Sequence, residues 1–438
     1  MGGAWGRRSK KNDGGFGEEL LALDAAVFAG EDGFDLKTFE EEVRKAVMRE
    51  GRRFLEDFLN NALPAMLGIS KVPGAKGVRP RKVITGLGEV TLRRVYTPGR
   101  VCPMDRALGL ECGCTAEAAS MLCFAAAMSE SYDKGEAAAR RLAGLDVPGR
   151  TIQRLVNIVS AQMKAANADT AQEPFPEGSV ANTQMDMTGV KVRPEDLEGT
   201  RGRDGDPSKK QVKVGVSFRQ VRGADGKLHM ERISIGHMVA FEGPAAFGER
   251  MRKWLDGRGL GKCSAHVVTS DGAQWIWDLV ETEFPDAVQI VDFYHASEHL
   301  MELCRLLHPE EDGAMARKTF DMRRRMLRRN GAGCLIRYFE ANGPFSPNAT
   351  EIGDKLDYFR NNESRMRYGE FKKAGYVIGS GAVEGSCRSL VNQRADLSGQ
   401  WWHPRGAVNI LRIRGMIIDG LHEKYWRSRG LARFRRAA

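Results

Sequence analysis

Residues 265–300 constrain the fold more than any other stretch, because their pattern alternates between strand, helix and strand. Residues 265–269 and 287–291 are short apolar runs, and residues 273–284 between them have apolar side chains at helical spacing. A helix that joins two apolar strands is a βαβ unit, so we expect parallel, buried strands. Ligands of such sheets bind beyond the carboxyl ends of the strands. Asp271 and Asp292, which follow the two strands, are therefore candidate functional residues.

The stretch before this unit predicts a three-stranded meander. Residues 180–192, 211–221 and 228–241 have strand patterns and are joined by hairpin connections. A short helix is expected at 247–255. After the unit, residues 299–375 are mainly helical, and a further helix is expected from Gly381 to about Arg394. The predicted fold class is α/β, with a mixed five-stranded sheet interrupted by a helical insertion.

The amino-terminal half has a different character. Residues 1–15 are rich in Gly, Lys and Arg and are expected to be disordered, and residues 16–67 have a helical pattern. Residues 82–97 predict a β-hairpin, and residues 116–164 are again helical. Within the latter, residues 136–159 have the spacing of a helix-turn-helix, with Arg154 and Asn157 exposed on its second helix. An ordinary helical hairpin is an equally good interpretation.

The expected boundaries of the parts follow from these patterns. They are a disordered start and helical region at 1–79, a β-hairpin and linker at 80–115, a helix-turn-helix-like DNA-binding region at 116–170, the first part of the sheet domain at 178–299, a basic helical insertion at 300–375, and the last part of the sheet domain with a basic tail at 376–438.

The charge distribution indicates a polyanionic partner. The chain has 67 Lys and Arg against 57 Asp and Glu, a net charge of +10, and residues 388–438 contain 11 basic and 3 acidic residues. Residues 317–329 contain seven Lys and Arg, although such runs are often only the solvated face of a helix. The candidate DNA-binding residues are Arg154, Asn157, Arg323, Arg324, Arg325, Arg388, Arg394, Arg433, Arg435 and Arg436.

The order of elements resembles the RNase H-like fold of DDE transposases and integrases. In that fold the first strand lies beside the fourth, which would bring Asp186 and Asp271 together, and a later helix supplies the third acid, a position that Glu384 fits. Each acid also has a simpler interpretation. Asp186 could be a turn residue, Asp271 could belong to an Asp-Gly turn, and Glu384 could be a first-turn acid favoured by the helix dipole.

Three blocks support a closer resemblance. QMDMTG, SDGAQWIWDLVETEFPDAVQIVDFYHASEHL and IGSGAVEGSCRSLVNQR…SGQWW are similar to the bacterial ISKra-type insertion-sequence transposases, relatives of the Mutator-like group. This resemblance implies that Asp186, Asp271 and Glu384 are the catalytic acids, and it matches the Asp-x-x-His element of the group to Asp292 and His295, which we expect to be accessory. Relatives often have a Cys-x-x-Cys near the hairpin, but this sequence keeps only Cys102, so a zinc site is not expected there.

A cluster of three carboxylates predicts a pair of hard cations. Oxygen-only ligation suits Mg²⁺ or Mn²⁺, and two such ions can catalyse phosphoryl transfer on DNA. We therefore expect a DNA transposase that acts on double-stranded element ends, the terminal inverted repeats, and on target DNA, as a homodimer or higher oligomer. The alternatives are an RNase H-like nuclease without strand transfer and a non-catalytic DNA-binding protein derived from a transposase. A cytoplasmic, nucleoid-associated location and no membrane span are expected, because no apolar run is long enough.

Overall fold

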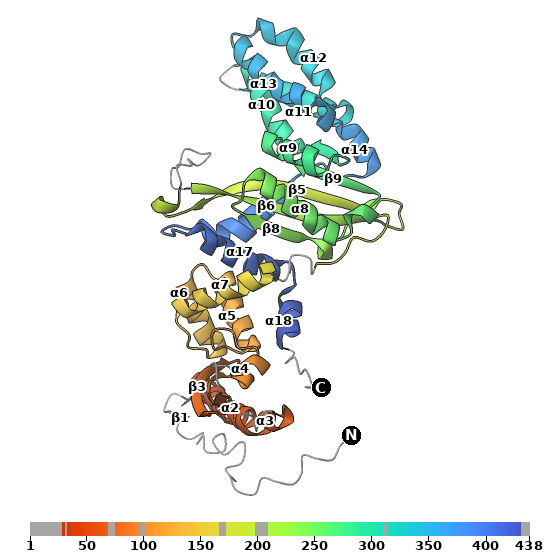
Figure 1. The fold of residues 1–438 in the computed structure, drawn as a ribbon. Helices are drawn as coiled ribbons and strands as arrows, with labels where there is room; N and C mark the ends of the chain where they lie inside the picture. The colour runs from red at the N-terminus through yellow and green to blue at the C-terminus, as the bar shows by residue number, and fades with distance from the viewer. Residues whose placement is uncertain are drawn as a thin grey trace. The chain divides into compact units, whose positions relative to one another are not determined.

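The computed structural model of the chain describes residues 29–30, 33–68, 75–96, 102–165, 172–197, 209–309 and 313–430 (Figure 1). These residues form two compact units. The first contains the described residues up to Ile158 and those from Glu423 onward, and the second contains Val159–His422. No helix in the described part of the chain is both long enough and apolar enough to cross a membrane.

In the first unit a long helix packs on the predicted β-hairpin. The elements are β1 (Ala29–Gly30), β2 (Gly33–Phe34), α2 (Leu36–Asp57), the π-helical turn η2 (Phe58–Ala62), α3 (Leu63–Met66), β3 (Gly77–Thr85) and β4 (Gly88–Tyr96). Helix α2 begins where Asp35 Oδ1 accepts the backbone N–H of Thr38. The prediction of helix from residue 16 is therefore wrong at residues 29–30 and 33–34, where β1 and β2 pair. Residues 1–28, which include the expected disordered start, and residues 31–32 lie outside the described residues.

Helices make up the rest of this unit. They are α4 (Pro103–Ala107), α5 (Ala116–Met128), α6 (Tyr132–Ala138) with the π-helical turn η4 (Ala139–Ala143), α7 (Gly149–Ala165), which extends into the second unit, and α18 (His422–Gly430). The predicted helix–turn–helix shape is present in α6, η4 and α7. Gly144 ends the first helical segment at φ 69°, a conformation that favours glycine, and the second begins at Gly149, two residues earlier than predicted.

The second unit is built on a mixed sheet. Its strands are β5 (Val180–Lys191), β6 (Lys209–Arg222), β7 (Leu228–Met230), β8 (Gly236–Ala240), β9 (Ala265–Ser270) and β10 (Val288–Val291). The order is β10-β9-β5-β6-β7, with β8 also paired to β6. Strands β10, β9 and β5 are mutually parallel neighbours, whereas β6 is antiparallel to β5. The predicted βαβ unit, with α9 (Gln274–Glu283) as its helix, and the pairing of the first with the fourth strand are confirmed.

The predicted five strands become six because the third strand of the meander is interrupted. A short 3-10 turn, η7 (Arg232–Ser234), separates β7 from β8. At this point the hydroxyl of Ser234 accepts the backbone N–H of Arg219 on β6, which replaces a strand-to-strand hydrogen bond. The other strand predictions in this unit are confirmed.

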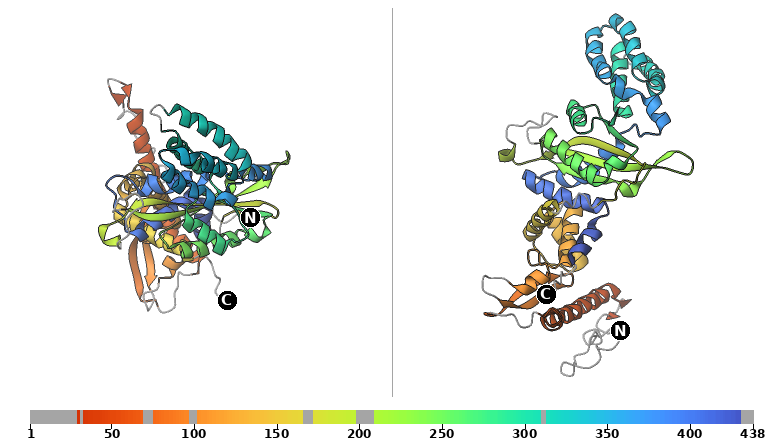
Figure 2. Two further views of the ribbon diagram at one scale, coloured as in Figure 1. Left: turned by 90° about the horizontal axis from the view of Figure 1, so that it is seen from above. Right: turned by 45° about the vertical axis from the view of Figure 1, so that its right-hand side comes forward.

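Helices cover both faces of the sheet and form a lobe beside it (Figures 1 and 2). Phe247 and Met251 of α8 (Pro244–Gly257) pack on Gly215 of β6, and α17 (Pro404–Ile418) lies against β8 on the opposite face. The lobe consists of α10 (Phe293–Leu307), α11 (Ala314–Asn330), α12 (Gly333–Asn342), α13 (Ala349–Asn361) and α14 (Tyr368–Ala374). The predicted helical insertion is thus present, but its first helix starts at Phe293 rather than near residue 300, because Asp292 caps it.

The chain then returns to the sheet through a broken helix. This helix consists of α15 (Gly381–Ser386), the π-helical segment η11 (Cys387–Asn392) and α16 (Gln393–Ala395), and it matches the predicted helix from Gly381 to about Arg394. The hydroxyl of Thr188 on β5 donates to Asn392, and Lys209 on β6 pairs with Asp396. These contacts hold the carboxyl end of the broken helix against the two central strands.

Candidate active site

Three aspartates lie near the point where the pairing between three adjacent parallel strands ends, although β5 itself continues beyond Asp186 to Lys191. Asp186 is on β5, Asp271 follows β9, and Asp292 follows β10. The register pairs Gln184 with Thr269, so its continuation puts Asp186 level with Asp271. The strand ends are tied together, since Ser270 Oγ donates to Met185 O at 2.7 Å and the backbone N–H of Asp292 donates to Ser270 O at 2.7 Å. The sheet therefore gathers all three carboxylates at one edge.

The loop after β9 has a defined shape around Asp271. Its Oδ1 accepts the N–H of Ala273 at 3.0 Å, and its carbonyl accepts the hydroxyl of Tyr358 at 3.1 Å. Gly272 has φ 100°, and a Cβ at this position would lie 3.0 Å from the Tyr358 ring. Only glycine fits both the conformation and the close approach. Tyr358 belongs to α13, so the helical lobe contacts the candidate site directly.

Helix α15 brings Glu384 to the same edge. The side chain of Gln184, two residues before Asp186, is fully buried and bonds to both sides of the turn that starts this helix. Its Nε2 donates to Gly379 O at 2.9 Å, and its Oε1 accepts the N–H of Val383 at 3.1 Å. One turn along, Cys387 Sγ lies 3.6 Å from Asp186 Oδ2. The helix that carries Glu384 is thus attached to the strand that carries Asp186.

Glu384 lies close to two further candidate ligands. Among the described residues, Asp292, His295 and Glu384 form the group whose possible ligand atoms all lie within 4.8 Å of one another. His295 Nδ1 is 3.4 Å from Asp292 Oδ1 and 3.9 Å from Glu384 Oε1. Ser380 is at the N-cap position of α15, but its hydroxyl donates to Glu384 Oε1 at 2.5 Å rather than accepting from a helix N–H.

Asp292 differs from the other acids because backbone groups already use its oxygens. Its side chain is fully buried, Oδ1 accepts the N–H groups of Tyr294 and His295 at 2.6 and 2.7 Å, and Oδ2 accepts the N–H of Ser380. Burial alone would raise the pKa of Asp292, but the hydrogen bonds from His295 and Ser380 outweigh it and lower the pKa. This arrangement favours a structural role, in which Asp292 joins α10 to the turn before α15.

The electrostatics of the cluster reflect crowded negative charge. Burial raises the pKa of Asp186, and the neighbouring Asp271 raises it further. The close carboxylate of Asp292 raises the pKa of His295 to about 9, with a smaller contribution from Glu384. The ring is therefore protonated at neutral pH, and its positive charge partly offsets the carboxylates around it.

The predicted DNA-binding residues occupy different environments. Arg154, Arg325 and Arg388 are exposed, whereas Asn157 is half-buried. Two arginines of α11 stack on aromatic rings inside the lobe, since the guanidinium of Arg323 lies 3.4 Å from the Tyr338 ring centre and that of Arg324 lies 5.3 Å from the Phe293 ring centre.

Arg394 differs from the prediction. It is fully buried, with its guanidinium 5.0 Å from the ring centre of Trp402, and offers no surface to DNA. Arg433, Arg435 and Arg436 lie outside the described residues.

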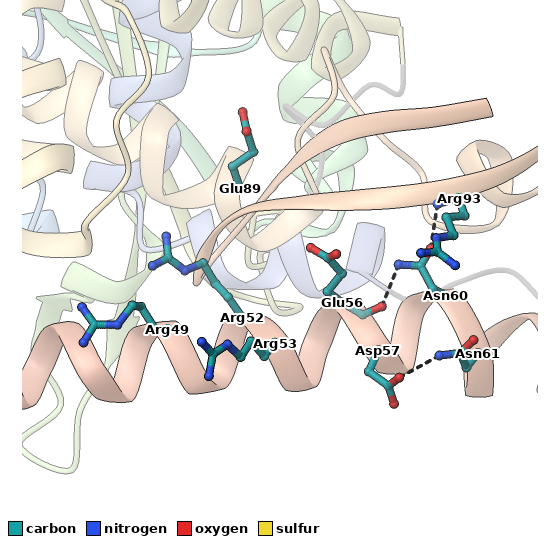
Figure 3. A pocket seen from close by; sticks show the side chains of 9 residues that line it. All are labelled: Arg49, Arg52, Arg53, Glu56, Asp57, Asn60, Asn61, Glu89 and Arg93. Carbon is teal, nitrogen blue, oxygen red and sulfur yellow. Dashed lines mark hydrogen bonds between the residues drawn. The ribbon is translucent and has the colours of Figure 1, made fainter. Parts of the chain in front are cut away.

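The first unit contains a hollow of about 440 Å³ between α2 and the β-hairpin (Figure 3). Four arginines and three acidic residues line it together with Asn60 and Asn61. Asn60 bridges the two elements, because its Nδ2 donates to Thr91 O at 2.8 Å and its Oδ1 accepts the N–H of Arg93 at 2.7 Å. The opposing charges nearly cancel, so this hollow has little preference for an anion over a cation.

Several residues that support the site were missed by sequence reasoning. Gln184, Tyr358 and Cys387 each hold an acid or its helix in place, yet none belongs to a pattern that a single sequence marks as functional. The contact of Ser380 with Glu384 was missed as well. The separation of four residues between the two was the available signal, because such residues lie on one helix face.

Comparisons with known proteins give a weak similarity to a solved structure. No protein-family model matches the sequence, and no curated protein matches it significantly. Among solved structures, the chain is similar to the Drosophila P element transposase strand transfer complex, with 10% sequence identity and a TM-score of 0.21, over 71% of this chain and 80% of that chain. A TM-score this low does not indicate a shared fold.

Proposed function

We propose that this chain is a metal-dependent DNA transposase that cleaves the ends of a mobile element and joins them to target DNA. The observation that carries the proposal is that Asp186, within β5, lies level with Asp271, just after the adjacent parallel strand β9. The helix that carries Glu384 is attached to β5 through Gln184. The strand order β8-β6-β5-β9-β10, with β6 alone antiparallel to both its neighbours in this series, supports an RNase H-like core.

The donor atoms at this edge fit Mg²⁺ or Mn²⁺. Asp186, Asp271 and Glu384 offer hard oxygen ligands, which these ions prefer. The raised pKa of Asp186 reflects a concentration of negative charge that bound cations would offset. Asp292, whose oxygens accept three backbone N–H groups, and His295 beside it would form an outer layer that orients Glu384.

The residues of the chain then have separate tasks. Two divalent ions, when bound, would activate the attacking water or 3′-hydroxyl and stabilise the leaving oxygen. Asp186 on β5, Asp271 after β9 and Glu384 on α15 would hold these ions through their carboxylate oxygens. His295, protonated at neutral pH, limits the repulsion between Glu384 and the remaining acids. Exposed basic residues such as Arg325 and Arg388 bind DNA phosphates.

The partner we propose is double-stranded DNA, bound by a homodimer or a higher homo-oligomer, because two element ends must be processed together. The helix-turn-helix of α6 and α7 would recognise the element ends, since Arg154 is exposed on its second helix. A location at the nucleoid would follow from this partner.

The test is a joining reaction. Labelled DNA fragments from the regions flanking the gene are incubated with the protein, a supercoiled target plasmid and Mg²⁺ or Mn²⁺. We expect cleavage at a defined position and covalent transfer of the label to the plasmid. Cleavage without transfer would instead identify a nuclease, and intact DNA with every flanking fragment and both metals would contradict the proposal.

A further inference from the structure

A buried chain of hydrogen bonds lies behind α15, apart from the carboxylate cluster. His237 of β8 has Nε2 2.8 Å from Ser386 Oγ at the end of α15 and Nδ1 2.5 Å from Asp419 Oδ1 at the end of α17. The side chains of His237 and Asp419 are only 6% and 3% exposed. Polar groups buried to this extent are costly unless they are paired, so this chain is a specific feature of the fold.

The chain continues from Asp419 into the core. Asp419 Oδ2 accepts the backbone N–H of His237 at 3.2 Å and Gln172 Nε2 at 2.6 Å. The amide oxygen of Gln172 accepts the indole N–H of Trp254, a buried residue of α8, at 3.0 Å. Gly236 allows this approach, because a Cβ there would lie 2.0 Å from Gln172 Oε1. The end of α15 is therefore connected to a helix on the other face of the sheet.

The order Ser–His–Asp is also that of a nucleophilic triad, but the hydrogen positions oppose that role. Ser386 Oγ lies 2.6 Å from Ala382 O, which can only accept, so the single hydroxyl hydrogen points to that carbonyl. Ser386 must then accept a hydrogen bond from His237 Nε2. A nucleophile needs the opposite direction, with the imidazole taking the hydroxyl proton. The contact holds the helix rather than activating the serine.

The positions of Glu384 and Ser386 on α15 indicate what the contact between His237 and Ser386 does. Residues that are two positions apart on an α-helix point about 200° away from each other. The side chains of Glu384 and Ser386 therefore leave α15 on opposite sides. We propose that the Ser386–His237–Asp419 chain is a positioning device that fixes α15 from behind and so holds Glu384 against the other metal ligands. This inference rests on the proposed function, because it assumes that Glu384 binds metal.

Helix α15 needs such support. Its regular α-helical part has only six residues, two of them glycine, before the helix widens into the π-helical segment η11. Glu384 is 50% exposed, so packing does not fix its side chain. A second carboxylate, that of Asp292, also lies close to it. Gln184 holds the start of the helix, and the His237 chain holds its end.

The test measures metal affinity in three full-length variants, Ser386→Ala, Asp419→Asn and Gly236→Ala. None of them changes a proposed metal ligand, and Gly236→Ala acts by displacing the amide of Gln172. Mn²⁺ binding to the DNA-free protein is followed by electron paramagnetic resonance. We expect Mn²⁺ affinity to fall about tenfold or more, as for other residues that orient metal ligands. Cleavage should weaken at low Mn²⁺ and recover at high Mn²⁺, with DNA affinity unchanged.

Ser160→Ala is the matched control. Ser160 is also buried and donates to Asn409 of α17 at 3.0 Å, but this contact does not reach α15. It should lower thermal stability comparably without changing Mn²⁺ affinity. Wild-type Mn²⁺ affinity in Ser386→Ala and Gly236→Ala would overturn this inference and leave the proposed function standing. It would also be overturned by labelling of Ser386 with a fluorophosphonate, which the adjoining cavity of about 580 Å³ would admit. A wild-type protein that binds no Mn²⁺ would overturn the proposed function as well.

Discussion

Asp186 is a residue whose proposed role as a metal ligand lowers the stability of the metal-free protein. Its pKa is raised by burial and by Asp271, so the ionised carboxylate that is present above this pKa destabilises the fold. Asp186→Asn should therefore raise the Tm of the metal-free protein at pH 7 by about 1 to 3 °C. Differential scanning fluorimetry measures this change. Mn²⁺ should raise the Tm of the wild type more than that of the variant. A lower Tm for metal-free Asp186→Asn than for the metal-free wild type would argue against repulsion between Asp186 and its neighbouring carboxylate.

Substitution of Asp292 should instead lower the stability of the protein. Asp292→Ala removes the N-cap of α10 and leaves the buried N–H of Ser380 without its acceptor. The expected loss is roughly 2–3 kcal/mol of unfolding free energy, from the cap and the unpaired group together. Urea denaturation followed by circular dichroism provides the measurement, with Asp271→Ala as the control. Equal losses in the two variants would contradict the structural role of Asp292.

At the scale of elements, the pairing of β5 with β9 contains a pH-sensitive residue. His266 of β9 lies with Nε2 2.9 Å from the Thr183 hydroxyl of β5, and burial together with the nearby Arg252 lowers its pKa from 6.5 to about 4. Between these values the unfolded chain binds more protons, so stability falls as pH drops from about 6.5 toward 4. The lost stability is roughly 2–3 kcal/mol at pH 4.

His266→Gln removes this titration and should flatten the decline in unfolding free energy between pH 6.5 and 4.5. Guanidinium denaturation curves at several pH values, for variant and wild type side by side, test the point. The same slope in both proteins would show that His266 is not responsible for the acid sensitivity.

Two basic elements should contribute differently to DNA binding. Arg154 on α7 is proposed to contact bases, whereas Arg433, Arg435 and Arg436 of the tail are proposed to contact phosphates. Neutralising the three tail arginines should weaken binding to every sequence alike and flatten its salt dependence, because fewer counterions are released. Arg154→Ala should instead reduce the ratio of specific to random DNA affinity, by about tenfold or more. Fluorescence anisotropy at several salt concentrations measures both, and an equal loss on all sequences from both changes would contradict a recognition role for α7.

At the scale of the whole molecule, the sequence predicted the order of elements better than their details. Periodicity identified the βαβ unit and the hairpin, because strand and helix periods differ and Gly or Pro marks their ends. It could not predict the break between β7 and β8, which depends on a side chain of Ser234 that replaces a backbone hydrogen bond. Nor could it predict the burial of Arg394, because the stacking on Trp402 exists only after the chain has folded.

The candidate site, like the fold, could be predicted from the sequence only in part. Acids at strand ends can be read from local sequence, so Asp271 and Asp292 were found directly. The resemblance and the expected strand order were needed to bring in Asp186 and Glu384, which lie 198 positions apart (384 − 186). The second layer of Gln184, Tyr358 and the His237 chain depends on tertiary contacts between distant segments, which periodicity does not report.

The most direct test of the central claim is a single-turnover cleavage and strand-transfer assay of four variants. Asp186→Asn, Asp271→Asn and Glu384→Gln should each abolish both steps, because each removes a charged ligand at nearly constant shape and catalysis by two ions requires both to be placed. Asp292→Asn should retain measurable activity, since its Oδ1 still accepts the N–H groups of Tyr294 and His295. Full activity in Glu384→Gln, or an inactive Asp292→Asn beside an active Asp271→Asn, would contradict the account.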